Sequence, residues 1–323
     1  MKVLVTGGNG FVGSAVVRAL AKAGHEIRCL LRPTSNTERI DSVRYEGTIG
    51  DVRDLASLRN AAAGCDTIIH LASLSSWDLI DSREMSDVVM TGTRNVLEAA
   101  KGQLARVVFV SSNTAIDGTD EPRVLDETAE FSLGKHNGLT YAKLKHRAER
   151  LCLESNETGV PVVIVNPAET YGPLDTELIT AGTLVDFAKS NPVLVPKGGG
   201  SIAHVEDVAN GIVLALERGT PGERYSLGGD HVEWKQLAEL TLDALGKKTR
   251  IIAIPNGLFR SMTKAATTLR VPLSYNPKIV PYATRYFYVS NRKAREHLGA
   301  EFRSARDTVT QTVAWLQQAG FIE

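Results

Sequence analysis

A glycine-rich turn directly after the first apolar run most constrains the fold of this chain. Residues 3–6 read Val-Leu-Val-Thr, glycines follow at positions 7, 8, 10 and 13, and an amphipathic stretch covers 14–22. Gly7 permits a tight turn, Gly10 leaves room for a pyrophosphate beside the backbone, and Gly13 allows close packing of a helix. The N-terminus of that helix supplies amide donors. An ordinary tight turn also explains spaced glycines, but the strand-to-helix context predicts a dinucleotide site at Gly7, Asn9, Gly10, Phe11, Val12 and Gly13.

Short β-branched runs alternate with helical stretches along the first half of the chain. The runs at 68–71 and 107–110 are apolar on both faces, which is typical of parallel strands covered by helices on both sides. The alternation predicts an α/β fold with a Rossmann-type, doubly wound parallel sheet. We expect strands at 2–6, 26–31, 43–46, 67–71, 107–111 and 160–166, and helices at 14–23, 54–63, 83–100 and 139–157, with Gly24, Gly64 and Gly159 as helix stops.

The composition changes after Asn166 to loops rich in proline and glycine. We therefore expect a dinucleotide-binding Rossmann domain at 1–166 and a smaller, interleaved substrate-binding lobe over most of 167–323. Segments near 205–227 return to the first domain, as a helix over 205–216 and a strand over 223–227. The stretch 256–274 has helical spacing, which predicts either a mobile cap over the site or a plain packing helix.

Overall charge and hydropathy exclude several classes of protein. Thirty-seven basic residues balance thirty-seven acidic ones, so no general field favours nucleic acid or an anionic membrane. Neither a signal peptide nor an apolar run of about 18 residues is visible, which predicts a cytoplasmic protein without a membrane span. Cys29, Cys65 and Cys152 lie far apart without a Cys-x-x-Cys pair, so we expect buried core residues and no metal site.

The end of the second expected strand bears on the choice of cofactor. NAD enzymes commonly place a carboxylate there to bind the ribose hydroxyls, but this chain has Arg32. A guanidinium pairs well with a 2′-phosphate, so we expect NADP, with NAD as the alternative if Arg32 is only a solvated strand-end residue. After the third strand, Asp51 can accept a hydrogen bond from the adenine amino group, while Val52 packs on the ring.

Proton-transfer chemistry is predicted at Tyr141-Ala-Lys-Leu-Lys145. Residues four apart share one helix face, so Lys145 can hold a positive charge near the Tyr141 hydroxyl. Ser112, after the fifth strand, can donate to the same substrate oxygen, and Ser111 is the runner-up for that role. The alternative is that both serines only cap the strand end.

These motifs resemble the extended short-chain dehydrogenase/reductase superfamily, also known as the NAD-dependent epimerase/dehydratase superfamily, and within it the dihydroflavonol 4-reductase-like group. That group includes proteins labelled hopanoid-associated sugar epimerases. Similarity covers nearly the whole chain and rests on 6–13, 50–54, 70–72, 92–99, 111–112, 141–145, 166–167, 172–173 and 204–209. The resemblance implies that Tyr141 is the general acid, that Lys145 lowers its pKa and grips the nicotinamide ribose, and that Ser112 polarises the reacting oxygen. It also implies cofactor contacts from Leu71, Ala72, Ser73, Pro167 and Ala168.

Four residues depart from the group's pattern or invite suspicion of chemistry. Glu169 places a carboxylate near the site, where it binds a hydroxylated substrate or faces solvent. Asp117 stands where many sugar-nucleotide enzymes carry an aromatic residue, which makes a nucleotide-sugar substrate less favoured. His70 and His204 lack partners at metal-ligand spacing, so we expect structural roles for both.

Three hypotheses for the function follow. The first is an NADP(H)-dependent oxidoreductase that reduces a ketone or aldehyde. The second is a sugar-nucleotide epimerase or dehydratase that uses bound NAD transiently, and the third is a cofactor-sensing regulator without catalysis. Arg32 speaks against the second, and the presence of Tyr141 and Lys145 speaks against the third.

The small-molecule substrate and the quaternary structure stay open. Trp77, Phe131, Tyr171 and Phe187 are candidate walls of the substrate pocket, which admits aromatic, steroid-like or sugar ligands. The resemblance implies a homodimer built from the helices at 83–100 and 139–157. Core burial explains the apolar residues of these helices equally well.

Overall fold

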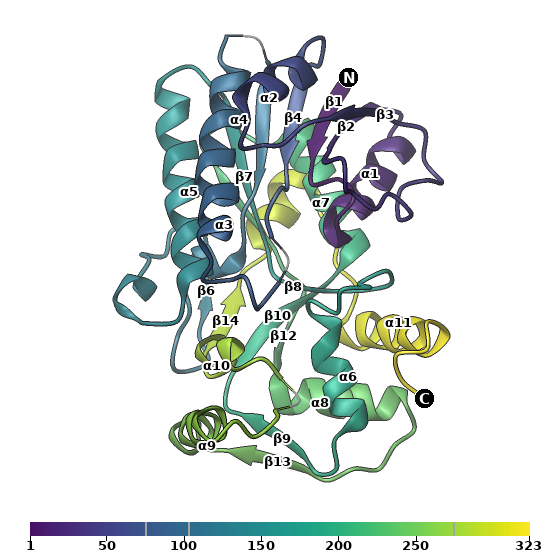
Figure 1. Ribbon diagram of the computed structural model, residues 1–323, viewed down its shortest axis with the longest axis vertical. Helices are drawn as coiled ribbons and strands as arrows, with labels where there is room; N and C mark the ends of the chain where they lie inside the picture. The colour runs from purple at the N-terminus through teal and green to yellow at the C-terminus, as the bar shows by residue number, and fades with distance from the viewer. Residues whose placement is uncertain (75, 103, 274) are drawn as a thin grey trace.

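A seven-stranded parallel sheet forms the half of the molecule that carries the N-terminus (Figure 1). The computed structural model describes residues 1–74, 76–102, 104–273 and 275–323. The strand order is β11-β7-β5-β4-β1-β2-β3, and every neighbouring pair is parallel. The expected Rossmann-type α/β fold is therefore confirmed. The strands are β1 (Lys2–Thr6), β2 (Glu26–Leu31), β3 (Glu46–Ile49), β4 (Thr67–His70), β5 (Arg106–Val110), β7 (Val162–Pro167) and β11 (Arg224–Leu227).

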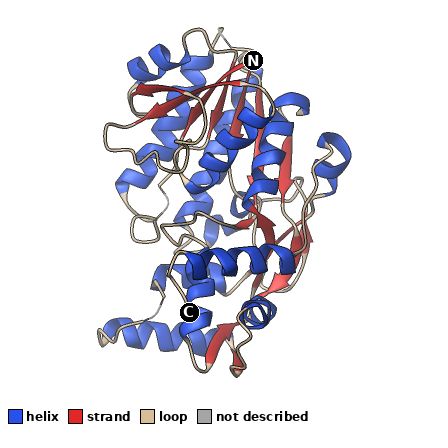
Figure 2. Ribbon diagram, turned by 90° about the vertical axis from the view of Figure 1, so that its right-hand side faces the viewer, coloured by secondary structure: helices blue, strands red, loops and turns tan. Residues whose placement is uncertain are grey.

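Helices cover both faces of this sheet, as the apolar strands require (Figure 2). Successive strand residues point to opposite faces, so Val3 and Val5 enter one core cluster and Leu4 enters another. The first cluster packs α1 (Phe11–Lys22) and α7 (Val205–Arg218), and the second packs α2 (Leu55–Ala62), α4 (Gly92–Ala100) and α5 (Thr140–Glu157). All three cysteines are buried and free, as expected.

Several boundaries differ from the sequence prediction, and α9 (Asn256–Thr268) ends at Thr268 rather than at residue 274. The third strand is Glu46–Ile49 and not 43–46, because this edge strand pairs only with β2 and carries the exposed Glu46, so it lacks a strong apolar signal. The first helix begins at Phe11 rather than at residue 14. The expected helix at 83–100 is interrupted, with α3 (Arg83–Ser86) and a π-helical turn, η1 (Asp87–Thr91), before α4.

A second, smaller sheet lies below the first in Figure 1 and gathers strands from distant parts of the chain. Its central strand, β10 (Gly199–His204), contacts β8 (Glu169–Tyr171), β12 (Asp230–Glu233) and β14 (Tyr286–Val289), and β14 pairs with β6 (Val124–Leu125). Thus β6 comes from the first 166 residues, whereas α7 and β11 return from the later part to the large sheet, as expected.

The remaining elements surround the small sheet. A core cluster of their own joins α6, α8 and α11 to β10. They are α6 (Ala181–Lys189), β9 (Val193–Pro196), α8 (Trp234–Ala244), β13 (Ile251–Ile254), α9 (Asn256–Thr268), α10 (Val280–Ala283) and α11 (Ala305–Gln318), with 3-10 turns at Asn113–Ala115, Leu133–Lys135 and Pro277–Ile279 and a π-helical turn at Ala294–Leu298. Among the described residues, no helix is both long enough and apolar enough to cross a membrane.

Candidate active site

One large cavity, of about 940 Å³, opens at the carboxyl ends of the parallel strands and continues between β8, α6 and α9. Ligands of doubly wound folds bind at this edge of the sheet. The structure brings every predicted cofactor and catalytic residue onto the wall of this cavity, namely Gly7, Asn9, Gly10, Phe11, Val12, Gly13, Arg32, Asp51, Val52, Leu71, Ala72, Ser73, Ser112, Tyr141, Lys145, Pro167 and Ala168.

The glycine turn has the shape of a phosphate cradle. Gly7 has φ +74°, and a Cβ there would lie 2.9 Å from the Ala72 backbone nitrogen. A Cβ on Gly13 would lie 2.0 Å from the Gly7 carbonyl oxygen, whereas a Cβ on Gly10 would meet protein only at 3.4 Å. Gly10 caps α1 without a side-chain hydrogen bond, so the first amides of the helix face the cavity. These features fit the pyrophosphate of a dinucleotide.

The adenosine end of the cavity carries mixed charges. Arg32 is exposed directly after β2, and its backbone N–H donates to the Ser35 hydroxyl at 3.0 Å. Asp51 accepts two side-chain hydrogen bonds from Arg53, at 2.9 and 2.7 Å, and this guanidinium lowers the pKa of the Asp51 carboxyl. The predicted partners of a 2′-phosphate and of adenine therefore lie at the same end.

Arg39 is a second cation at this end that the sequence reasoning missed. Its side chain donates to the Asn9 carbonyl oxygen at 3.2 Å and to the Leu174 carbonyl oxygen at 2.9 Å, and it pairs with Glu177. Arg39 thereby ties the loop after β8 to the glycine turn. No local motif reveals such a contact, because its partners lie up to 138 residues away.

Tyr141 and Lys145 lie one turn apart on α5 and face the cavity. Burial raises the pKa of the Tyr141 phenol to about 12, while its hydrogen bond with Ser112 acts in the opposite direction. The Lys145 ammonium donates to the Val110 carbonyl oxygen at 2.9 Å and lies 5.9 Å from the centre of the Tyr141 ring. Burial lowers the pKa of Lys145 to about 8, against the opposing effect of the Glu149 carboxylate. The expectation that Lys145 lowers the pKa of Tyr141 is therefore not met: burial outweighs the hydrogen bond with Ser112, and the phenol stays protonated at neutral pH.

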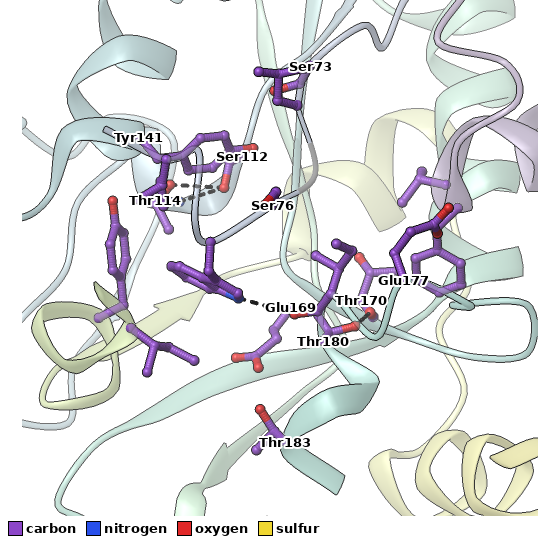
Figure 3. A pocket seen from close by; sticks show the side chains of 18 of the residues that line it. Ser73, Ser76, Ser112, Thr114, Tyr141, Glu169, Thr170, Glu177, Thr180 and Thr183 are labelled. Carbon is purple, nitrogen blue, oxygen red and sulfur yellow. Dashed lines mark hydrogen bonds between the residues drawn. The ribbon is translucent and has the colours of Figure 1, made fainter. Parts of the chain in front are cut away.

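Ser112 is placed beside Tyr141 on the cavity wall (Figure 3). Its hydroxyl also contacts the Thr114 hydroxyl at 3.0 Å and accepts from the Thr114 backbone N–H at 3.2 Å. Ser111 lines the cavity too, but its hydroxyl has no hydrogen-bond partner among the described residues. The contact with Tyr141 favours Ser112 over Ser111, and Thr114 is a supporting hydroxyl that the sequence reasoning missed.

The far part of the cavity has mainly apolar walls. Trp77 and Phe187 line it, as expected. The same prediction was wrong for Phe131 and Tyr171. Phe131 stacks on His146 with ring centres 4.1 Å apart, and Tyr171 is fully buried in the core around β10.

Glu169 projects into the cavity across from Tyr141 and Ser112 (Figure 3). One carboxylate oxygen accepts a hydrogen bond from the Tyr171 hydroxyl at 2.6 Å. Burial raises the pKa of this carboxyl to about 7, and the hydrogen bond from Tyr171 partly offsets that effect. Of the two roles left open by the sequence, the position on the cavity wall favours contact with a bound molecule.

A buried ionic network supports α5 outside the cavity. Glu149 lies one turn after Lys145 and accepts hydrogen bonds from Asn166 at 2.5 Å and from Arg224 at 3.2 Å. Asn166 also donates to the Ser112 carbonyl oxygen at 2.9 Å. Glu149 thus links α5 to the ends of β5 and β7. The sequence signal that could have revealed Glu149 is its position four residues after Lys145, on the same face of the helix.

The two suspected histidines have structural positions, as expected. His70 is buried between the hydroxyls of Thr6 and Thr93, at 2.7 and 3.4 Å, and burial lowers its pKa to about 3. His204 caps α7 by accepting from the Glu206 backbone N–H at 3.2 Å. The described residues contain no group of three or more side chains placed to hold a metal ion.

The sheet, the glycine cradle and the tyrosine–lysine pair define a Rossmann-type protein with a dinucleotide site beside a proton-transfer centre. A sequence profile of the NAD dependent epimerase/dehydratase family matches residues 3–228. The chain belongs to this family, so a nicotinamide dinucleotide is the class of cofactor that its fold accommodates. Members of the family are oxidoreductases and epimerases of the short-chain dehydrogenase/reductase type.

Relatives with other names share the whole length of the chain. A Synechocystis sp. protein named as a dihydroflavonol 4-reductase is 28% identical, over 99% of this chain and 95% of that one, which bears out the resemblance to that group. A Stigmatella aurantiaca protein, 4-hydroxy-2-methyl-3-oxo-4-farnesyl-3,4-dihydroquinoline-1-oxide ketoreductase, is 30% identical over 99% of this chain and 97% of that one.

Solved structures agree with the fold. The crystal structure of gox2253 superposes with a TM-score of 0.85 at 30% identity, covering 99% of both chains. The Thermus thermophilus UDP-glucose 4-epimerase, solved in complex with NAD, gives a TM-score of 0.76 at 24% identity, covering 99% of this chain and 100% of that one.

Proposed function

We propose that this protein is an NADP(H)-dependent reductase of a largely apolar ketone or aldehyde. The observation that carries the proposal is the distribution of charge on the cavity wall. Among the described lining residues, the cations are Arg32, Arg39 and Lys145, and all three lie at the cofactor or catalytic end. The substrate end combines aromatic and aliphatic walls with the carboxyl groups of Glu169 and Asp186.

This distribution favours a reductase over a sugar-nucleotide epimerase. A nucleotide-sugar substrate carries a diphosphate, which proteins usually bind with arginine, lysine or a helix N-terminus. No lysine or arginine is among the described residues that line the substrate end, so a diphosphate there would have no cationic side chain to pair with. The epimerase alternative is supported by the family description, and it keeps the same cofactor cleft.

The proposed reaction uses the protonated Tyr141 phenol as its acid. Tyr141 donates its proton to the substrate oxygen, and Ser112 donates a hydrogen bond to that oxygen as negative charge develops. The positive charge of Lys145 lies next to the Tyr141 ring and stabilises the phenolate that remains once the proton has been donated. A bound nicotinamide supplies the hydride, which goes to the carbonyl carbon. The product is the corresponding alcohol.

Arg32 is proposed to select NADP. Its guanidinium is exposed at the end of β2, where it can pair with a 2′-phosphate, and no carboxylate follows β2 to bind two ribose hydroxyls.

The test is loss of NADPH absorbance with a panel of aldehydes, aromatic ketones and steroid-like ketones, for the wild type and for Tyr141→Phe. We expect turnover to fall by at least about 100-fold in that variant, while NADPH binding is kept. Tyr275→Phe is the matched control, because Tyr275 lines the same cavity but bonds to Thr263 at 2.7 Å. If the protein retains tightly bound NAD and consumes no NADPH with any carbonyl compound, the epimerase alternative is favoured and the reductase proposal fails.

A homodimer through the helices at 83–100 and 139–157 also belongs to this proposal. Figure 1 shows α4 and α5 side by side, and both pack on the same face of the large sheet. The large side chains of these two helices that the structure describes include no strongly exposed apolar one, so such an interface would be mainly polar. Sedimentation equilibrium of the purified protein tests it.

A further inference from the structure

The outward face of α9 is apolar, although nothing in the described chain covers it. Leu258, Met262 and Leu269 are 55%, 45% and 75% exposed, and their spacing of four and seven residues places them on one side of the helix. Val271 and Leu194 are also exposed at this end. Five of the nine strongly exposed large apolar side chains of the described chain therefore lie here, which is an unusual concentration.

The fold does not need this apolar face. On its other side α9 is anchored by Phe259, which is buried against Ile254 and Val280, and by the buried Thr263, whose hydroxyl contacts the Tyr275 hydroxyl at 2.7 Å. The exposed stripe also borders the large cavity, because Met262 and Leu194 line it as well. The apolar surface is thus continuous with the substrate end of the cavity.

The charge around this face is strongly one-sided. From residue 244 to residue 277, the stretch that contains β13 and α9, the sequence has six lysines and arginines and no aspartate or glutamate, although the whole chain is neutral. Arg260, Lys264 and Arg270 are exposed on or next to α9. The basic stretch at 247–250 leads into β13, which lies at the same end of the molecule as α9 in Figure 1. The local field is positive where the apolar side chains are exposed.

We propose that the α9 face docks onto the surface of a bilayer that contains anionic lipids. Interfacial helices combine an apolar face with flanking lysines and arginines, and they bind by apolar insertion together with attraction to negative headgroups. A second copy of this chain fits less well, because pairing two α9 faces would bring like charges together. An acidic protein partner would match the charge but not the protruding leucines. Docking places the substrate end of the cavity next to the lipid.

This docking surface does not depend on which reaction the cavity performs. Leu258, Lys264, Leu269 and Arg270 do not line the cavity. NADPH binding and thermal unfolding therefore report on the integrity of each variant, and vesicle binding reports on the surface.

The experiment is co-sedimentation of the full chain with vesicles of phosphatidylcholine alone and of phosphatidylcholine mixed with phosphatidylglycerol. We expect binding to the anionic vesicles that weakens with added salt. The double variant Lys264→Glu, Arg270→Glu should bind at least about tenfold more weakly, because each basic residue near such a surface contributes about a fivefold factor. The double variant Leu258→Ser, Leu269→Ser should also lose binding.

Matched controls lie on the cofactor half of the molecule. Lys22→Glu with Arg44→Glu makes the same change in net charge at exposed positions, and Ile49→Ser removes an apolar side chain that is 65% exposed. Both controls should bind vesicles as the wild type does. The proposal is overturned if the wild type does not bind anionic vesicles, or if the control variants weaken binding as much as the α9 variants do. It is also overturned if sedimentation equilibrium shows that the α9 variants act by dissociating an oligomer.

Discussion

Replacing Glu169 by glutamine should stabilise the protein at alkaline pH and have little effect at acidic pH. The side chain is half-buried on the cavity wall, and loss of hydration there raises the pKa of its carboxyl from an ordinary value of 4.5 to about 7. Between those values the folded state binds a proton that the unfolded state has released, so stability falls as the pH rises through this range. Glutamine cannot ionise, and its amide oxygen can still accept the hydrogen bond from Tyr171.

The size of the effect follows from the two pKa values. A carboxyl whose pKa rises from 4.5 to about 7 loses roughly 3 kcal/mol of stability once the pH is well above 7. Water in the cavity reduces this penalty, so we expect Glu169→Gln to raise the free energy of unfolding by about 2 kcal/mol more at pH ~8 than at pH ~5.

The assay is urea unfolding of the wild type and of Glu169→Gln at both pH values. Tyr171→Phe is the companion variant, because it removes the hydrogen bond that partly offsets the effect of burial on the pKa of Glu169. Its loss of stability should be larger at the higher pH. An equal effect of Glu169→Gln at the two pH values would refute the reasoning, since it would mean that Glu169 does not change its protonation over this range.

Three further predictions concern the cofactor end. Arg32→Ala should raise the KM for NADPH by about tenfold and leave that for NADH unchanged, because it removes a charge-assisted pair to the 2′-phosphate, while Arg44→Ala, at an exposed position away from the cavity, should change neither. Gly13→Ala should fold poorly in thermal unfolding assays, because its Cβ would lie 2.0 Å from the Gly7 carbonyl oxygen. Gly10→Ala should fold normally but bind NADPH weakly in titrations, because its Cβ meets protein only at 3.4 Å and points into the space proposed for the pyrophosphate.

Local sequence patterns predicted most of the parallel sheet and the contents of the cofactor cleft. The glycine spacing requires a tight turn before α1, and the apolar strands require helices on both faces, so these features depend on residues close together in the sequence. Tyr141 and Lys145 share a helix face for the same reason. The edge strand β3 was misplaced because its exposed polar residues carry little of the apolar signal.

The substrate end depended on contacts that no local pattern contains. Phe131 and Tyr171 were predicted to line the pocket. Instead, Phe131 stacks on His146 and Tyr171 packs in the core around β10. Arg39 and Glu149 gained their roles from partners 135 and 75 residues away, respectively.

The sequence by itself determined the class of fold, the dinucleotide turn and the spacing of the proposed proton donor, because backbone geometry and helix periodicity act over a few residues. Only the tertiary structure decided that Glu169 is half-buried on the cavity wall, that the cations gather at the cofactor end, and that α9 exposes its leucines. Burial and electrostatic surroundings are set by every segment that packs nearby, so they exist only once distant parts of the chain have met.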